Sequence, residues 1–199
     1  MRKKKTSNLF NTIAPVYALY YNYQHRHYKD TLETMWDKFS LSDYNNILDV
    51  GCGTGALAAA FKDRGLQVTG IDTADKMLAQ ARKRPENAGI EFMLASAIER
   101  LPFEDNHFDL SIASFVAHGL PKAERQRMYT EMNRVTKSSV IIYDYNKTHS
   151  LTTSVVEWLE HGDYFNFIKG PRAELMQCFA SVEVLDVDAR SVWYICTSL

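Results

Sequence analysis

The chain has 199 residues, 46% of them hydrophobic and 24% charged, and a net charge of −1. This length is typical of one domain that buries its own core, so neither disulfides nor a structural metal is needed. A near-neutral chain lacks the broad basic face of a nucleic-acid-binding protein. No apolar stretch approaches the ~18 residues of a membrane-spanning helix, and the basic N-terminus is not followed by the apolar region of a signal peptide.

The three cysteines, Cys52, Cys178 and Cys196, are widely spaced and form no CxxC pair. This spacing favours a reducing compartment and a cytoplasmic location, and it disfavours a zinc site. The six histidines are scattered, and His25 and His27 would point apart on a helix because they are two residues apart. We therefore expect a small-molecule substrate and no metal, nucleic acid or membrane as a partner. The oligomeric state stays open.

The first 40 residues are predicted to form a helical lid. The basic run from Arg2 to Lys5 is interpreted as a solvated tail. Apolar and aromatic residues then recur at helical spacing and predict two helices within residues 6–39. The residues that set this spacing are Phe10, Ile13, Tyr17, Tyr20, Tyr21, Leu32, Met35, Trp36 and Phe39.

The central part of the chain alternates between apolar strands and helices. Gly65 and Pro85 follow two of the expected helices as stop signals. Strands that alternate with helices predict a parallel sheet covered by helices on both faces. The expected strands are residues 46–50, 67–72, 90–97, 108–114 and 139–145, and the expected helices are residues 56–64, 74–84 and 121–136.

The last part of the chain predicts a different ending. Residues 171–179 are expected to form a helix, and residues 182–187 and 192–197 two strands. The gap between these strands is too short for a crossover helix, so they must form an antiparallel hairpin. The sequence thus predicts an α/β fold with a doubly wound, mostly parallel, seven-stranded Rossmann-like sheet that ends in an antiparallel hairpin. We expect a single domain over 1–199, with a lid (1–40), a cofactor-binding core (41–146) and a substrate-side region (147–199).

A glycine-rich loop joins the first expected strand to the first core helix. It reads Gly51-Cys52-Gly53-Thr54-Gly55. Glycines allow a tight turn and a close approach of the backbone to a ligand, and the following helix N-terminus offers free N–H groups. The loop also fits the G-x-G-x-x-A form of the dinucleotide fingerprint, because Ala56 takes the last position.

Two aspartates favour another ligand over a dinucleotide. Asp49 lies just before the loop, where a carboxylate suits an ammonium group and would repel a pyrophosphate. Asp72 ends the second strand, 21 residues after Gly51, and can accept hydrogen bonds from both hydroxyls of a ribose. The terminal hairpin is also unusual for a dehydrogenase.

The run Ile47–Gly55 resembles motif I of the class I S-adenosylmethionine-dependent methyltransferases. Over residues 8–199 the chain is similar to their small-molecule subgroup, which includes the ubiquinone/menaquinone-biosynthesis type. This resemblance implies S-adenosylmethionine as the cofactor and in-line methyl transfer to a small-molecule acceptor. The other motifs that carry it are Gly70-Ile71-Asp72 with Met77-Leu78, Leu101-Pro102-Phe103 with Phe108-Asp109-Leu110, and Glu131-Met132-Asn133-Arg134-Val135.

The resemblance also implies roles for the matched positions. Gly51, Gly53 and Gly55, with Cys52 between them, would line the methionine part of the cofactor, and Asp49 would lie near its amino group. The other implied contacts are Asp72 with the ribose, Thr73 and Met77 on either side of the adenine, Ser96 and Ala97 at its edge, and Ser114 beside the methionine part.

The chain departs from the family pattern at two places. The family often has Asp where this chain has Ser96, and serine accepts a hydrogen bond more weakly, so we expect looser adenine recognition there. The usual glycines before the fifth strand are replaced by Ser138-Ser139, which alters a turn and leaves the cofactor contacts unchanged.

Several residues keep two interpretations. His118 follows the fourth strand, where family members often carry a histidine, and is either a general base or a structural residue bonded to the backbone. Asp144, which ends the fifth strand, is either functional or a cap, and the Cys52 thiol is either reactive or a space-filler. The tyrosines form either an aromatic cage for a cationic substrate or ordinary packing; they are Tyr17, Tyr20, Tyr21, Tyr23 and Tyr28.

Two other functions compete with a methyltransferase. A nicotinamide-dependent oxidoreductase is disfavoured by Asp49 and the hairpin, whereas a non-catalytic S-adenosylmethionine-binding module would keep the same loop. A nucleic-acid or protein methyltransferase is a third alternative. Residues 114–117 read Ser-Phe-Val-Ala and lack the proline-rich tetrad of base-amino methyltransferases, and no basic patch replaces it. We expect residues 6–39 and about 147–170 to build the substrate pocket.

Overall fold

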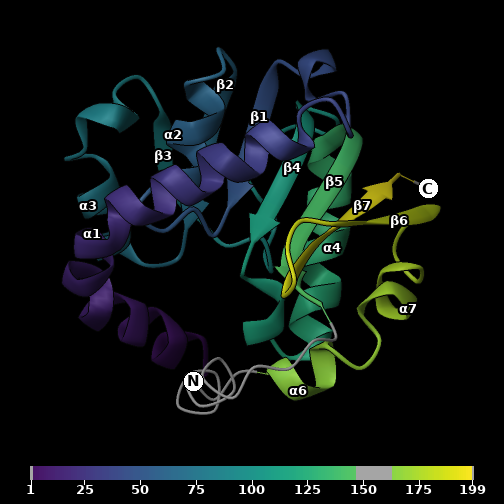
Figure 1. Cartoon of the computed structure of the whole chain (residues 1–199). Coiled ribbons are helices and arrows are strands. Elements are labelled where there is room, and N and C mark those ends of the chain that lie inside the picture. Colours follow the sequence, from purple (N-terminus) through teal and green to yellow (C-terminus); the bar gives the residue numbers. More distant parts are fainter. Residues whose placement is uncertain (1, 147–162, 199) are drawn as a thin grey trace. The chain divides into compact units, whose positions relative to one another are not determined.

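The computed structural model describes residues 2–146 and 163–198 (Figure 1). They belong to two compact units, Met1–Ser96 and Ala97–Leu199. The division falls within the predicted cofactor-binding core, and the assignment of the chain to one domain stays a prediction. Residues 147–162, which contain most of the predicted substrate-side loop, lie outside the described residues.

One long helix, α1 (Arg2–Met35), opens the first unit. The prediction of two helices is therefore wrong, because no proline or glycine interrupts residues 16–35. Pro15 lies inside the helix, where it lacks the backbone N–H that would complete the hydrogen-bond ladder, and Figure 1 shows α1 (purple) bending along its length. The basic run from Arg2 to Lys5 has a helical backbone, and its solvation stays a prediction.

Three parallel strands form the sheet of the first unit, in the order β3-β2-β1. Asp49 pairs with Gly70 in the register of β1 and β2, so these two strands end side by side. α2 is alanine-rich and buries six of its residues, while Gly65, with a φ of 86°, turns the chain back toward β2. The elements are η1 (Leu41–Asp43), β1 (Asn46–Val50), α2 (Ala56–Lys62), β2 (Gln67–Asp72), α3 (Asp75–Ala81), η2 (Pro85–Asn87) and β3 (Glu91–Leu94).

The second unit continues with two parallel strands and ends in a hairpin, in the order β4-β5-β7-β6. β4 pairs with β5 in parallel, and β7 is antiparallel to both β5 and β6, as Figure 1 shows in green and yellow. The expected helix at 171–179 ends early, at Leu175. The elements are β4 (Phe108–Ser114), η3 (Ala117–Gly119), α4 (Lys122–Val135), β5 (Thr136–Tyr145), α6 (Tyr164–Phe167), α7 (Pro171–Leu175), β6 (Ser181–Asp186) and β7 (Ser191–Thr197).

Seven strands lie within the described residues, and the antiparallel pairings among them are those of β7 with β5 and β6. This confirms the predicted α/β class with a mostly parallel, seven-stranded set of strands and an antiparallel finish. β5 buries residues on both of its sides, since residues 140–144 are all buried. Within the described ranges, no helix is both long enough and apolar enough to cross a membrane.

Candidate functional site

The glycine loop after β1 has positive φ angles, which residues with a side chain rarely adopt. Gly51, Gly53 and Gly55 have φ values of 72°, 54° and 80°. The N–H groups of Gly51 and Cys52 donate to the Ile71 carbonyl at 2.8 and 3.0 Å, and Gly55 N–H donates to the Cys52 carbonyl at 2.8 Å. The loop is thereby folded tightly against the end of β2, as the glycine pattern predicted.

Close packing behind the loop leaves no room for side chains. A Cβ on Gly55 would lie 2.5 Å from Asn87 Nδ2 and 2.8 Å from Phe92 Cζ. A Cβ on Gly70 would lie 2.9 Å from Cys52 Sγ. Burial raises the pKa of the Cys52 thiol well above its usual value, so the thiol stays protonated. These contacts favour the space-filling interpretation of Cys52.

Asn87 supports the loop from behind, a role that no sequence pattern predicted. Its side-chain Nδ2 donates to the carbonyls of Thr54 at 3.0 Å and Ala81 at 2.8 Å, while its Oδ1 accepts from the Tyr21 hydroxyl at 2.8 Å. One buried amide thus ties the loop to α1 and α3. A single asparagine after a proline resembles any turn residue, so only the tertiary structure reveals this role.

Asp72, at the end of β2, organises the loop from the other side. Its two carboxylate oxygens accept the N–H groups of Gly53 and Ala74, each at 2.8 Å. Burial raises the pKa of Asp72, while these backbone donors act in the opposite direction. Each carboxylate oxygen can accept more than one hydrogen bond, so the side chain retains capacity for a ligand's hydroxyl groups.

Asp49 is a buried carboxylate beside this loop. It is 1% exposed, and its Oδ2 has no hydrogen-bond partner among the described residues. Burial and, secondarily, the charge of Asp72 raise the pKa of Asp49 to about 7. An unpartnered buried carboxylate oxygen is costly unless a positive or donor group satisfies it. Asp49 therefore favours a ligand that brings such a group.

The other predicted positions of the first unit have different surroundings. Met77 is buried with Ala14 and Ala74, and aromatic residues of α1 pack against this cluster. Thr73 is exposed and Ser96 is half-buried. Met77 is thus held by α1, while Thr73 remains open to solvent.

The tyrosines of α1 do not converge on one point. Tyr21 is fully buried and lies under the Arg84 guanidinium, 4.5 Å from the ring centroid. Tyr20 and Tyr23 are 60% and 72% exposed. Because Tyr20 and Tyr23 lie on a different face of the helix from Tyr21, the five tyrosines do not form a single aromatic cage.

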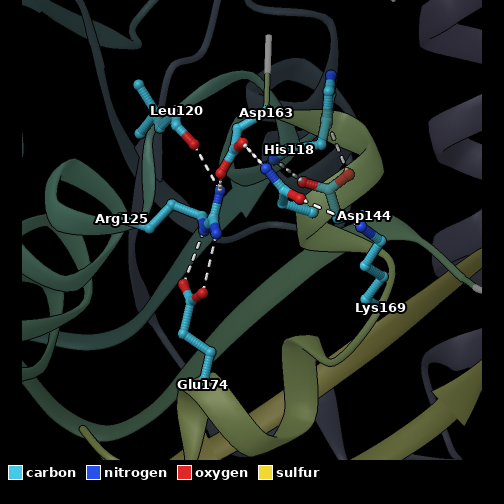
Figure 2. Close-up of polar contacts among 8 residues, drawn as sticks. His118, Leu120, Arg125, Asp144, Asp163, Lys169 and Glu174 are labelled. Atoms are coloured by element: carbon cyan, nitrogen blue, oxygen red, sulfur yellow. Dashed lines mark hydrogen bonds and ion pairs between the residues drawn. The ribbon is translucent and has the colours of Figure 1, made fainter.

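The second unit contains Ala97, Ser114 and His118 of the predicted set. Ala97 is buried, and Ser114 ends β4 opposite Tyr143 of β5. His118 lies in η3, and its Nδ1 is 2.7 Å from Asp144 Oδ1. Figure 2 shows the imidazole and this carboxylate side by side. The partner of His118 is therefore a carboxylate, not only the backbone.

Asp144 also fixes the backbone around the imidazole. Its Oδ2 accepts His118 N–H at 3.2 Å, and its Oδ1 accepts Tyr145 N–H at 2.8 Å. Both residues are almost fully buried. Because β4 and β5 are parallel neighbours, residues that follow their carboxyl ends meet, and this spacing was the available signal for the pair.

Aromatic rings surround the His118–Asp144 pair. The Tyr145 ring centroid lies 4.9 Å from that of His118, and the Tyr164 ring lies 5.3 Å from that of Tyr145. Phe115 adopts a φ of 54°, which is unfavourable for a non-glycine residue, and its ring lies 5.1 Å from that of Tyr145. Such strain persists where the surrounding structure enforces it, often at functional sites.

A buried arginine holds the segment on the other side of His118. Arg125 of α4 forms two parallel bonds to Glu174 of α7, at 2.7 and 2.9 Å, and a third to Asp163 Oδ2 at 2.9 Å. Asp163 N–H in turn donates to the His118 carbonyl at 3.0 Å. These contacts, most of which Figure 2 shows, connect α4 and α7 to the backbone of η3. None of these three charged residues was predicted from the sequence.

Comparisons with known proteins agree with this geometry. A family model described as a methyltransferase domain matches residues 47–139. The chain is 32% identical to the demethylmenaquinone methyltransferase of Thermotoga maritima over 142 residues, covering 68% of this chain and 58% of that protein. The class I S-adenosylmethionine-dependent methyltransferases are the family that the chain resembles. The expected family resemblance is thereby confirmed.

Other relatives of this methyltransferase family differ in what they methylate. The malonyl-[acyl-carrier protein] O-methyltransferase of Erwinia pyrifoliae is 31% identical over 150 residues, covering 73% of this chain and 51% of that protein. The chain thus spans only about half the length of these two curated relatives. These two relatives are therefore named for the methylation of different acceptors.

Solved structures match the fold over most of the chain. A protein of Pyrococcus horikoshii has a TM-score of 0.71 at 20% identity, covering 85% of this chain and 89% of that one. The magnesium protoporphyrin IX methyltransferase of Synechocystis PCC 6803, with bound S-adenosylhomocysteine, has a TM-score of 0.60 at 16% identity, covering 87% and 84%. The fold class is therefore that of the methyltransferases.

Proposed function

We propose that the chain catalyses transfer of a methyl group from S-adenosylmethionine to a small-molecule acceptor. The observation that carries this proposal is the unpartnered Oδ2 of Asp49, a buried carboxylate oxygen next to a glycine loop. The ammonium of the cofactor's methionine part is a group of the required sign, and a pyrophosphate is not. The similarity to the methyltransferase family supports the same cofactor.

The residues present fit this cofactor in the first unit. Asp49 would face its ammonium group, and Asp72 would accept its ribose hydroxyls with the lone pairs left over from Gly53 and Ala74. The loop presents backbone and no side chains at its glycine positions, so the methionine part can approach closely. The other proposed contacts are Cys52, Thr73, Met77 and Ser96 of the first unit, and Ala97 and Ser114 of the second.

When bound, S-adenosylmethionine supplies an activated methyl group on a positively charged sulfur. The chain's own task is then to align the acceptor, exclude water and remove a proton where the acceptor has one. His118 is the proposed base. With Nδ1 bonded to the Asp144 carboxylate at 2.7 Å, the proton sits on Nδ1 and the lone pair on Nε2 is the basic one.

A small acceptor fits the rest of the chain. One relative is named for methylation of demethylmenaquinone, which is a small molecule, and the near-neutral charge of this chain offers no broad basic face. The single domain, the N-terminal lid over residues 1–40 and the substrate-side region over residues 147–199 are parts of the same proposal.

Calorimetry separates this proposal from its competitors. We expect S-adenosylmethionine and S-adenosylhomocysteine to bind and NAD to give no heat. A screen of small metabolites for release of S-adenosylhomocysteine then tests turnover. Binding of NAD alone would reject the cofactor assignment, whereas cofactor binding with no turnover across phenols, quinols, amines and carboxylates would indicate a binding module.

A further inference from the structure

The outer face of α1 carries an apolar stripe that the fold leaves in solvent. Among the described residues, nine large hydrophobic side chains are exposed, and five of them lie on this one helix. Leu19, at 83%, and Tyr23, at 72%, are the most exposed of all nine. We call this set the α1 stripe; its members are Leu9, Val16, Leu19, Tyr20 and Tyr23.

The α1 stripe lies opposite the face that α1 buries. Ala14, Tyr21 and Leu32 are fully buried, and their positions fall on the reverse side of the helix from residues 9, 16, 20 and 23. The helix therefore has two apolar faces, only one of which the described structure covers. Scattered surface hydrophobics need no explanation, but a continuous helical stripe marks a binding surface.

Charge along α1 points to the nature of the partner. Six basic residues and no acidic residue occur between Arg2 and Lys29, although the whole chain has a net charge of −1. Residues 30–199 therefore carry a net charge of −7. Lys29 contacts Asp63 at 3.2 Å, while Arg26 is exposed close to the stripe. The helix combines an exposed apolar side with strong local positive charge.

The first turn of α1 places positive charge where the helix itself disfavours it. The turn has no acidic residue and begins with four consecutive basic residues, Arg2 to Lys5. The N-terminal end of a helix carries partial positive charge, so a basic sequence is unfavourable at this end. A surface of negative charge offsets this unfavourable interaction.

We propose that α1 docks this protein onto an anionic lipid surface, with the α1 stripe among the headgroups and its basic residues at the phosphates. A helix with exposed Leu, Val and Tyr beside Lys and Arg matches the composition of interfacial helices. Tyrosine suits this position, because its ring is apolar and its hydroxyl stays in contact with water. This surface is independent of the proposed cofactor site.

Two other occupants fit the surface less well. A second copy of the chain would bring the same basic helix against itself in a two-fold contact, so like charges would meet. RNA would satisfy the charge but would leave Val16 and Leu19 without a stacking partner, since only aromatic side chains offer base-stacking faces. The lipid surface satisfies both the apolar and the charged side of the helix.

Vesicle co-sedimentation of the full chain tests the proposal. We expect binding to vesicles of phosphatidylcholine mixed with phosphatidylglycerol, weaker binding at high salt, and little binding to phosphatidylcholine alone. Leu19→Asp should weaken binding about tenfold, since it replaces a buried apolar contact by a charge. Arg26→Glu should weaken it by about tenfold or more, because it reverses one charge.

Matched controls change the same residue types elsewhere. Met176→Asp alters an exposed apolar side chain of the second unit, and Arg127→Glu alters an exposed cation of α4. Both should bind vesicles as the parent does. Circular dichroism and binding of S-adenosylhomocysteine report folding of each variant separately, so loss of cofactor binding would concern the proposed function and not this surface.

Three results would overturn the proposal. One is equal binding, or no binding, to the neutral and anionic vesicles. The second is a dimer whose dissociation by Leu19→Asp shows that a second copy covers the stripe. The third is RNA binding that Arg26→Glu weakens and Leu19→Asp leaves intact, with no vesicle binding.

Discussion

A single residue, Asp49, is expected to make cofactor affinity depend on pH. Its pKa of about 7 means that the free protein holds a proton there in much of the neutral range. The proposed ammonium partner requires the charged form. Affinity for S-adenosylhomocysteine should therefore rise by up to about tenfold per pH unit as pH approaches 7 from below, and level off above it.

Asp49→Asn should remove this pH dependence and lower affinity at pH 8. Asp75→Asn, an exposed neighbour of Asp72, serves as the control and should leave both unchanged. The raised pKa of Asp49 also affects the stability of the fold. A raised carboxyl pKa means that the folded state binds the proton more tightly, so the free energy of unfolding falls as pH rises from about 4 to 7. Asp49→Asn should abolish this fall in apo protein.

His118 and Asp144 define a second prediction for single residues. His118→Ala should lower turnover by about 10²-fold or more, the lower range for a general base, while affinity for S-adenosylhomocysteine stays almost unchanged. The loss should shrink at high pH, where the acceptor loses its proton unaided. Steady-state kinetics over pH, with calorimetry as the binding control, measure both effects.

Asp144→Asn separates orientation from charge at the same site. The amide can keep a hydrogen bond to His118 but no longer stabilises a protonated imidazole. A structural role for the pair predicts loss of stability with no change in the pH profile, and a catalytic role predicts a changed pH profile in a stable protein. An unchanged profile for both variants would contradict the assignment of His118 as the base.

Gly55 and Gly65 allow a test at the scale of the loop element. Their φ values are 80° and 86°, so an alanine would strain the backbone at each position. Only at Gly55 would the added Cβ meet another group, Asn87 Nδ2 at 2.5 Å, whereas nothing lies within 4 Å at Gly65. The difference between the two variants therefore isolates the clash.

We expect Gly65→Ala to lower the free energy of unfolding by about 1 kcal/mol, the cost of a left-handed alanine. Gly55→Ala should cost about 1–3 kcal/mol more, because overpacking forces Asn87 and the loop apart. It should also weaken binding of S-adenosylhomocysteine. Chemical denaturation and calorimetry measure the two quantities, and equal effects of both variants would contradict the packing seen behind the loop.

Arg125 makes the corresponding prediction for the contact between α4 and α7. Arg125→Ala leaves Glu174, itself 9% exposed, as an unpaired buried carboxylate, so the free energy of unfolding should fall by about 3–5 kcal/mol. Arg127→Ala, two positions further along α4 and exposed, should change it by less than about 0.5 kcal/mol. Similar small effects for both would mean that the ion pairs contribute little.

For the whole molecule, the uneven charge has consequences that the net value conceals. Residues up to Lys29 carry six positive charges, and the remaining chain carries a net charge of −7. In the sequence alone, the near-zero total disfavoured nucleic acids as partners, and the lack of a long apolar stretch disfavoured a membrane. The structure shows an exposed apolar stripe on the same helix as this positive charge, and composition alone does not reveal that they occur together.

The sequence by itself determined the strands, the antiparallel finish and the glycine loop. β1, β2 and β4 have the bounds that their apolar runs indicated, because short buried strands and glycine turns depend on local residue types. Asp49 and Asp72 were found in the same way, since their spacing from the glycines fixes their place in the fold.

Only the tertiary structure decided which polar side chains meet. The Asn87 amide behind the loop, the His118–Asp144 pair and the Arg125–Glu174 bonds join residues between 26 and 66 positions apart. The continuity of α1 through Pro15 was decided there too, because packing along the helix outweighs the loss of one hydrogen bond. Local pattern carries information about elements, whereas these contacts depend on how the chain folds back on itself.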